Sequence, residues 1–284
     1  MRRHPDPIGP GRVAAVTGAA SGIGRALALA MGRSGVRLGL GDVDEAGLAD
    51  VANQVRSRGG VVATQVVDVA DAAEVQSWAT GVAGQMGAIH MVWNVAGIIN
   101  AGEVLQSDLA DLHRLLAVDF WGVVHGTTAF LPLIVDAGGG NVVNVSSAFG
   151  LISAPAYGGY NAAKFAVRGW TDALRQEMRL AGTGVRVTCV YPGGVRTPIM
   201  TKSTSAAGEE DARRRREFFE TRVARTDPEA AAATILRGVR AGRSRVLVGA
   251  DAYIADALPR VTATGYEHLL TAATRLGTRL RPRA

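Results

Sequence analysis

The stretch TGAASGIGRALALA, residues 17–30, decides the fold of this chain. Its three glycines, Gly18, Gly22 and Gly24, follow the spacing G-x-x-x-G-x-G, with an apolar segment before them and a helical pattern after them. Glycine lets the backbone approach a ligand closely because it has no Cβ atom, and the N-terminus of a helix attracts anions. The pattern predicts a strand–loop–helix unit that binds a pyrophosphate through Gly18, Ser21, Gly22, Ile23 and Gly24.

Strand-like and helix-like segments alternate along the rest of the chain. Apolar runs predict seven strands, within RVAAVTG, VRLGLGD, VVATQVVDV, AIHMVWNVAG, NVVNVSS, VRVTCVYPG and SRVLVGA. Continuously apolar strands are typical of a parallel sheet that is covered on both faces. Their alternation with helical segments predicts an α/β fold, a doubly wound, Rossmann-like parallel sheet of seven strands with helices on both faces.

Length and composition indicate one globular domain. The chain has 284 residues, of which 48% are hydrophobic and 20% charged, as in ordinary globular proteins. We expect a flexible leader at 1–11, a Rossmann-type domain at 12–250 with a lid at about 198–225, and a C-terminal helical extension at 251–284. Within that extension Tyr266 and Leu270 have helical spacing, which favours a subunit-contact helix over a membrane-surface helix.

Composition also argues against several classes of function. The single cysteine, Cys189, excludes an internal disulfide, and the five scattered histidines have no ligand spacing, so no metal site is predicted. No apolar run has the length of a bilayer span and no secretory signal is present, so we expect a cytoplasmic protein without membrane insertion.

The net charge of +6 raises the question of an acidic partner. Much of the excess lies in ARRRREFFETR, which acidic residues precede at the spacing of ion pairs within a helix. This favours a solvated helix over contact with an acidic substrate or a phosphate. The basic clusters are not interleaved with aromatic residues, so no nucleic-acid partner is expected.

Asp42 ends the second predicted strand, 18 residues after Gly24. An acidic residue near this separation meets the adenosine ribose in dinucleotide-binding folds. Its carboxylate would repel a 2′-phosphate by roughly 2–4 kcal/mol at a distance near 4 Å, and no basic residue stands at position 43 or before Gly22 to compensate. The pattern predicts NAD(H) rather than NADP(H), and a purely turn-forming aspartate is the alternative.

The stretch AYGGYNAAK, residues 156–164, holds two tyrosines and one lysine. Tyr160 lies four residues before Lys164, so both share a helix face, whereas Tyr157 has Asn161 at that offset. A phenol that acts as a base near neutrality must have its pKa lowered by about 3 units, at a cost of roughly 4 kcal/mol. A lysine cation about 4 Å away supplies on the order of that amount. The spacing predicts that Tyr160 transfers a proton and that Lys164 lowers its pKa.

Six motifs, in order, resemble those of the short-chain dehydrogenase/reductase (SDR) family of the compact, single-domain type. They are TGxxxGxG at 17–24, Asp-Val at 68–69, most of NNAG at 94–97, NVSS at 144–147, YxxxK at 160–164 and PGxVxT at 192–197. The resemblance covers about residues 11–250.

The resemblance implies roles for further residues. Ser147 precedes Tyr160 by 13 residues, the usual separation in the family, and would hold the substrate oxygen against the phenol. Side chains alternate across a strand, so we choose Ser147 over Ser146. Lys164 would also hold the nicotinamide ribose. The other implied cofactor contacts are Asp68, Val69, Asn94, Ala96, Gly97, Pro192, Gly193, Val195 and Thr197.

Two positions depart from the family pattern. The fourth catalytic residue is usually an asparagine, and Asp119 stands there in the segment VDFWG. This aspartate could hold the relay water of the family, or it could pair with Lys164 and weaken the effect of the lysine on Tyr160. Val95 replaces the second asparagine of NNAG.

Together these patterns predict an NAD-dependent short-chain alcohol dehydrogenase or ketoreductase. We expect an apolar substrate pocket, and therefore a hydrophobic secondary alcohol and its ketone, with walls formed by Ile98, Ile99, Phe149, Leu151 and Ile152. The alternatives are an NADP(H)-linked carbonyl reductase and a catalytically silent NAD-binding regulatory protein. Long helices at about 107–137 and 158–181 resemble those through which relatives form homodimers or homotetramers.

Overall fold

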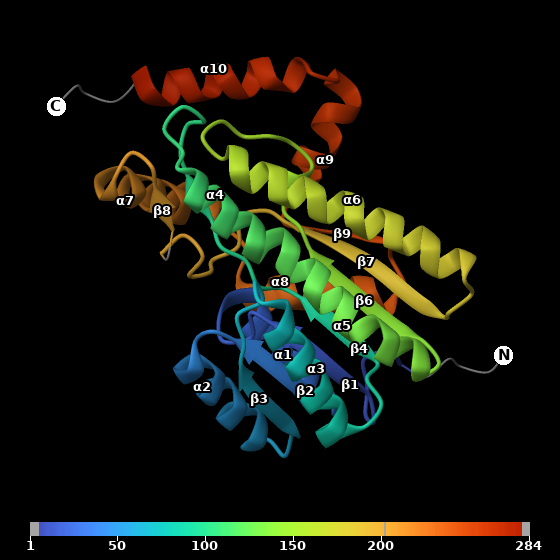
Figure 1. Ribbon diagram of the computed structural model, residues 1–284. Helices are drawn as coiled ribbons and strands as arrows, with labels where there is room; N and C mark the ends of the chain where they lie inside the picture. Colours follow the sequence, from blue (N-terminus) through green and yellow to red (C-terminus); the bar gives the residue numbers. More distant parts are fainter. Residues whose placement is uncertain (1–5, 202, 280–284) are drawn as a thin grey trace.

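The computed structural model describes residues 6–201 and 203–279. Its centre is one sheet of seven parallel strands in the spatial order β3-β2-β1-β4-β6-β7-β9 (Figure 1). The predicted doubly wound sheet is thereby confirmed. The strands are β1 (Val13–Thr17), β2 (Arg37–Asp42), β3 (Val62–Val66), β4 (Met91–Asn94), β6 (Gly140–Val145), β7 (Val185–Pro192) and β9 (Arg245–Val248).

Helices cover both faces of the sheet (Figure 1). Alternate residues of a strand point to opposite faces, and in β1 the side chains of Ala14 and Val16 join one core cluster while those of Val13 and Ala15 join the other. The first cluster contains apolar residues of α1 (Gly22–Arg33), α2 (Glu45–Arg56) and α8 (Pro228–Arg240). The second contains apolar residues of α3 (Ala72–Met86), α5 (Gly122–Asp136) and α6 (Gly158–Leu180).

The predicted helix at 107–137 is interrupted by a wider turn. It consists of α4 (Leu109–Leu116), the π-helical turn η1 (Ala117–Trp121) and α5. By length and composition alone, Leu109–Asp136 could cross a membrane, but 56% of its apolar window is buried inside the fold. Such burial is typical of a core helix in a globular domain.

Part of the flexible leader expected at 1–11 is packed against the domain instead. Ile8 is completely buried in the same core cluster as α1 and α8. Arg240 of α8 forms an ion pair with Asp6 at 3.3 Å and donates a hydrogen bond to the carbonyl of Ile8 at 3.1 Å. Residues 1–5 lie outside the described residues.

The rest of the chain lies around the carboxyl ends of the strands. Two short strands, β5 (Asn100–Ala101) and β8 (Thr204–Ser205), pair in parallel and connect the segment after β4 to the predicted lid. The lid continues through α7 (Glu209–Phe218) and the π-helical turn η3 (Phe219–Val223). Helix α7 carries its own ion pairs, Glu210–Arg213 and Asp211–Arg215, as its sequence predicts. Two helices end the described chain, α9 (Ala250–Thr262) and α10 (Gly265–Arg279).

Candidate active site

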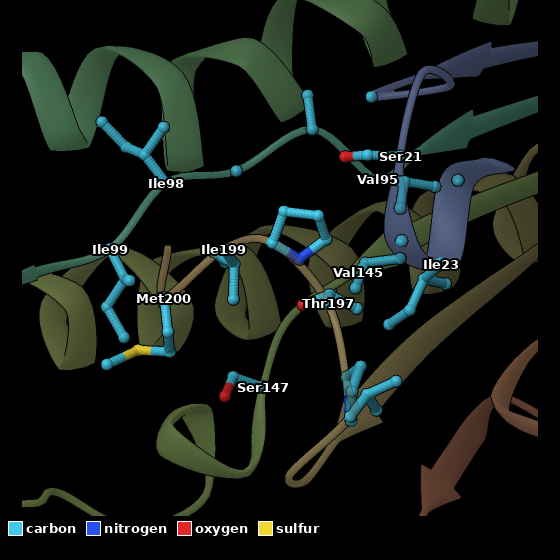
Figure 2. A pocket seen from close by; sticks show the side chains of 18 of the residues that line it. Ser21, Ile23, Val95, Ile98, Ile99, Val145, Ser147, Thr197, Ile199 and Met200 are labelled. Atoms are coloured by element: carbon cyan, nitrogen blue, oxygen red, sulfur yellow. The ribbon is translucent and has the colours of Figure 1, made fainter. Parts of the chain in front are cut away.

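A cavity of about 310 Å³ lies at the carboxyl ends of the parallel strands. In open α/β sheets this is the edge at which ligands bind, next to the point where the strand order reverses. Figure 2 shows Ser21, Ile23 and Val95 at one side of the cavity and Ile98, Ile99 and Met200 at the other. The cavity therefore joins the glycine-rich loop to an apolar compartment.

The glycine-rich loop requires its glycines for close backbone packing. Gly18 has a φ of +65°, and a Cβ atom there would lie 2.8 Å from the backbone of Ala96. A Cβ atom on Gly24 would overlap the carbonyl oxygen of Gly18. The side chain of Ser21, the N-cap of α1, makes no capping hydrogen bond. Free N–H groups at this helix start, beside an open cavity, fit a pyrophosphate.

Asp42 lies on the cavity wall and also stabilises the loop. One carboxylate oxygen accepts a hydrogen bond from the backbone N–H of Ala20 at 2.9 Å, and the other accepts one from that of Asp44 at 3.1 Å. Asp42 therefore stabilises the turn and lines the cavity at the same time. Each carboxylate oxygen has a second lone pair that can accept a hydrogen bond from a ribose hydroxyl.

The predicted proton-transfer residues lie together at the cavity wall. Ser147 follows β6, while Tyr160 and Lys164 are on α6. The hydroxyl of Ser146 donates to the carbonyl of Lys164 at 2.8 Å, within the protein. The hydroxyl oxygen of Ser147 accepts a hydrogen bond from the N–H of Phe149 at 3.1 Å, and the same side chain acts to lower the pKa of Tyr160.

Asp119 and Lys164 form a buried ion pair behind this wall. Their Oδ2 and Nζ atoms are 3.0 Å apart, and the two side chains are 0% and 4% exposed. The other oxygen of Asp119 accepts a hydrogen bond from the N–H of Ile98 at 2.7 Å. Of the two possibilities that the sequence left open for Asp119, the structure shows the pairing with Lys164.

The pKa of Tyr160 is raised, not lowered as the sequence predicts. Burial of the phenol is the largest cause, Lys164 opposes it, and Asp119 adds to it. Burial pulls the pKa of Lys164 down, but Asp119 and Tyr160 more than offset this, so the lysine stays cationic through neutral pH. The sequence argument counted the lysine charge and omitted both burial and the partner carboxylate.

Three predicted contacts lie away from the cavity wall. The buried amide of Asn94 donates to Asn144 at 2.8 Å and to Thr127 at 3.2 Å, so it connects β4 to β6 and α5. Leu151 and Ile152, predicted as substrate-pocket residues, are buried in a core cluster with Cys189 and Tyr191 instead. The short 3₁₀ helix η2 (Ala148–Gly150) turns the chain after Phe149, which lines the cavity, so that the next two side chains pack against β7.

Apart from Asp119, which lies behind the wall, the other predicted site residues line the cavity. From the glycine loop and strand ends these are Gly18, Ser21, Gly22, Ile23, Gly24, Asp42, Asp68, Val69, Ala96, Gly97, Ile98 and Ile99. From the second half of the chain they are Ser147, Phe149, Tyr160, Lys164, Pro192, Gly193, Val195 and Thr197. Their roles toward a ligand stay predictions.

Two charged residues of the wall were missed by the sequence reasoning. Arg114 of α4 forms an ion pair with Asp68 at 2.9 Å. Asp251, at the start of α9, accepts a hydrogen bond from the N–H of Gly194 and so fixes the loop after β7. Asp251 could have been found from its position just after the last strand, because the cavity lies at the carboxyl ends of the strands.

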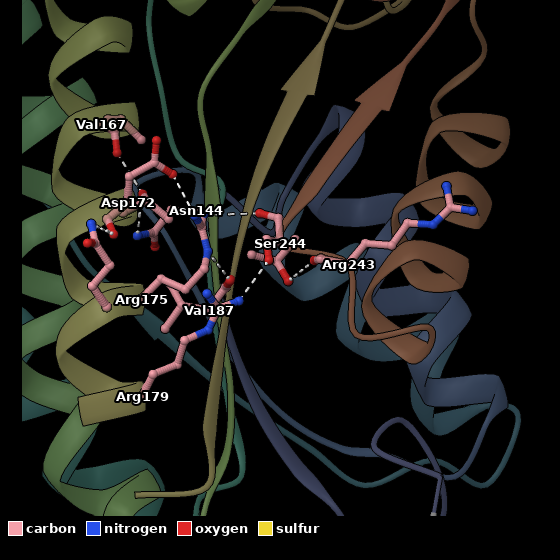
Figure 3. A network of polar contacts seen from close by, with 11 residues as sticks. Asn144, Val167, Asp172, Arg175, Arg179, Val187, Arg243 and Ser244 are labelled. Carbon is pink, nitrogen blue, oxygen red and sulfur yellow. Dashed lines mark hydrogen bonds and ion pairs between the residues drawn. The ribbon is translucent and has the colours of Figure 1, made fainter. Parts of the chain in front are cut away.

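A polar network anchors α6 to the sheet (Figure 3). The guanidinium of Arg175 donates to the carbonyl of Val187 in β7 at 3.0 Å and to that of Ser244, just before β9, at 3.1 Å. Asn144 of β6 donates to Thr171 of α6 at 3.0 Å. These contacts fix the helix that carries Tyr160 and Lys164.

Comparison with known proteins gives consistent matches. A family model described as short chain dehydrogenase matches residues 12–208. The protein named as the oxidoreductase SadH, of Mycobacterium tuberculosis strain H37Rv, is 47% identical over 262 residues, 92% of this chain and 95% of its own length. The 2,5-dichloro-2,5-cyclohexadiene-1,4-diol dehydrogenase LinX of Sphingobium indicum is 33% identical over 192 residues, 66% of this chain and 75% of its own.

A solved structure is also similar over almost the whole chain. It is a short chain dehydrogenase/reductase from Burkholderia phymatum in complex with NAD, with a TM-score of 0.84 and 28% identity. The match covers 89% of this chain and 94% of that protein.

Proposed function

The chain belongs to the short-chain dehydrogenase/reductase family and is an oxidoreductase of that family, and on this premise we propose that it interconverts a hydrophobic secondary alcohol and its ketone with NAD(H). The observation that carries this proposal is the juxtaposition of Ser147, Tyr160 and Lys164 on the wall of a cavity that begins at the glycine-rich loop. These are the groups that a proton transfer to or from a substrate oxygen requires.

The choice of NAD(H) over NADP(H) is supported by Asp42. Its carboxylate lines the cavity beside the loop, where it favours ribose hydroxyls and repels a 2′-phosphate. The similar Burkholderia phymatum structure is a complex with NAD. When bound, this cofactor would supply or accept the hydride. The glycine loop, Asp42, Asp68, Val195 and Thr197 would hold it.

The residues of this chain account for the proton. The hydroxyl of Ser147 would orient the substrate oxygen, and the phenol of Tyr160 would donate a proton to a carbonyl oxygen or take one from an alcohol. Lys164 would hold the ribose next to the nicotinamide. The ion pair with Asp119 and a hydrogen bond to the carbonyl of Val145 at 3.4 Å leave one of the three lysine N–H groups for the ribose.

The apolar compartment supports a hydrophobic substrate. Its walls include Ile98, Ile99, Phe149, Met200 and Phe219. The predicted lid contributes the last two of these, so the substrate would be enclosed between the segment after β4 and the lid. The relative LinX is named as the dehydrogenase of a cyclic diol, which supports a secondary alcohol as the reduced partner.

We further expect a homodimer or homotetramer formed through the long helices. Trp121 at the π-helical turn is 51% exposed and Phe165 on α6 is 37% exposed. Exposed aromatic residues on neighbouring helices favour contact with a second copy.

The test is a substitution of each tyrosine in AYGGYNAAK. Tyr160→Phe removes the proton donor and should lower NADH-dependent ketone reduction by about 10²–10⁴-fold. Tyr157→Phe is the matched control. It keeps the ring, whose centre lies 5.5 Å from that of Phe149, and the loss of the hydroxyl should change turnover only a few-fold. Both variants should bind NADH as the wild type does, measured by calorimetry. Full activity of Tyr160→Phe would overturn the role of Tyr160, whereas NADH binding without turnover in the wild type would favour the catalytically silent, NAD-binding alternative.

A further inference from the structure

The ion pair between Asp119 and Lys164 has a consequence for the direction of the proposed reaction. The inference rests on the proposed function, because it concerns the proton that Tyr160 transfers. Lys164 Nζ lies 5.5 Å from the centre of the Tyr160 ring and 3.0 Å from Asp119 Oδ2. Asp119 is thus in direct ion-pair contact with the lysine charge, which also faces the Tyr160 ring.

The backbone is shaped to admit this pair. Asp119 lies in the π-helical turn η1, and such turns occur frequently at functional sites. Gly97 passes beside the pair, and a Cβ atom there would lie 3.3 Å from Nζ of Lys164 and 3.4 Å from Oδ2 of Asp119. With the N–H of Ile98 on its second oxygen, the carboxylate is held in one orientation from two sides.

Few other charges act on the phenol. Among the described residues, Lys164 and Asp119 are the charged groups that act on Tyr160, and the polar side chain of Ser147 acts to lower its pKa. Cys189 of β7 also faces Lys164, but burial raises the pKa of its thiol to about 11, so it is neutral near pH 7. A cation and an anion close together largely cancel at a third site, so the lysine cannot stabilise a phenolate as an unpaired cation would.

We propose that Asp119 is a positioning residue that neutralises Lys164 and thereby keeps Tyr160 protonated, so that the site donates a proton to a ketone at neutral pH and accepts one from an alcohol only in alkaline solution. In reduction, the hydride of NADH goes to the carbonyl carbon and the phenolic proton of Tyr160 goes to the oxygen. The resulting phenolate takes up one proton from solvent. The balance is ketone, NADH and one proton giving alcohol and NAD⁺.

The direction of the pH dependence follows from the protonation state that each reaction needs. Reduction needs the neutral phenol, so its rate stays constant through neutrality and falls only above the raised pKa of Tyr160. Oxidation needs the phenolate, so its rate rises toward that same pKa. An uncompensated Lys164 would bring both changes to lower pH.

The test is a direct titration of Tyr160 in the holoenzyme with NADH, by NMR of protein labelled with ¹³C at Cζ of tyrosine. The chain has five tyrosines, and the Tyr160→Phe spectrum assigns the signal. Asp119→Asn keeps the shape and removes the negative charge, so it should lower the titration midpoint of Tyr160 by about one unit or more. Asp251→Asn, a change of the same kind elsewhere on the cavity wall, should leave the midpoint in place.

Steady-state rates provide the second measurement. In Asp119→Asn, the rise of the oxidation rate and the fall of the reduction rate should both move to lower pH by the shift that NMR measures. Should that variant fail to fold, Lys164→Gln decides. If Asp119 neutralises Lys164, removal of the lysine changes the Tyr160 midpoint little, because Asp119 becomes protonated when it loses its partner. If the lysine charge is not compensated, its removal raises the Tyr160 midpoint strongly.

The outcomes separate this inference from the proposed function. An unchanged midpoint in Asp119→Asn, or a large upward shift in Lys164→Gln, overturns the inference even if the enzyme reduces ketones. Absence of turnover in every folded form, including the wild type, counts against the proposed function, and the NMR titration still decides the effect of Asp119.

Discussion

Asp42 combines two tasks in one carboxylate at the residue scale. It holds the glycine loop through the N–H of Ala20 and the turn after its own strand through that of Asp44. Because both bonds hold the carboxylate in the cavity wall, its charge stays beside the proposed site of the adenosine ribose. The proposed preference for NADH should therefore depend on this one side chain.

Removing that carboxylate gives a sharp prediction. The wild type should bind NADH at least about tenfold more tightly than NADPH, from a repulsion of more than about 1.4 kcal/mol. Asp42→Ala should abolish this ratio and also weaken NADH binding, because the loop loses a support. Calorimetric titration with each dinucleotide measures both effects, and Asp50→Ala on the exposed face of α2 is the control. Tighter NADPH binding by the wild type would contradict this use of Asp42.

The sequence predicted most of the site because its motifs lie where strands end. Tyr160 and Lys164 share one turn of a helix, and the local spacing is enough to place them together. The partner of Lys164 could not be identified in the same way. Asp119 is 45 positions away in a π-helical turn, and the sequence offered two uses for it. Leu151 was misplaced because its direction depends on a 3₁₀ turn that has no periodic signal.

At the scale of elements, α5 packs closely on β4 through a glycine. A Cβ atom on Gly126 would overlap Oδ1 of Asn94, whose amide bonds with Asn144 and Thr127. The backbone of α5 at Gly126 thus packs directly against the side chain of Asn94 in β4. The whole hydrogen-bond chain from β4 through β6 to α6 depends on that spacing.

Substitution of glycine by alanine tests this packing. Gly126→Ala should destabilise the protein by about 1–3 kcal/mol, because it forces a buried amide off its partners. Gly169→Ala, an exposed position of α6 with open space around it, should stabilise the fold by about 0.5–1 kcal/mol through helix propensity alone. Urea unfolding gives both free energies. A neutral Gly126→Ala would show that α5 can move away from β4 without cost.

The sheet was predictable from sequence as far as its strands are continuous and apolar. Six of the seven central strands fall within the predicted segments, and β6 begins one residue before its segment, at Gly140. Strands that are buried on both faces leave such unbroken apolar runs. The β5–β8 pair was not predicted, because two residues per strand carry no periodicity. The interruption of the 109–136 helix was also missed, since a π-helical turn keeps the composition of the helix around it.

At the scale of the whole molecule, the start of the described chain packs into the core and is held by α8. Ile8 is buried in the core cluster that includes residues of α1 and α8, and Arg240 holds the backbone beside it. One apolar residue in a polar segment gives too weak a signal to be distinguished from a free leader. Burial of Ile8 couples the chain start to a helix more than two hundred residues later.

Truncation of the Ile8 side chain tests how much this packing stabilises the fold. Ile8→Ala should lower the free energy of unfolding by about 2–5 kcal/mol, as expected for a fully buried isoleucine. Val104→Ala, at an apolar side chain that is 81% exposed, should change it by no more than about 0.5 kcal/mol. Denaturant unfolding measures both. Identical midpoints for the two variants would mean that residues 6–11 behave as the flexible leader first expected.

The one thiol of this chain lies in β7, between β6 and the edge strand β9. Cys189 is completely buried, and its raised pKa keeps it in the unreactive protonated form. Thiol reagents therefore have no target on the folded surface of the natural chain. A cysteine engineered onto α7 could carry a single fluorescent label to follow motion of the lid, without first removing a native thiol. Labelling of Cys189 itself would report only the opening of the sheet.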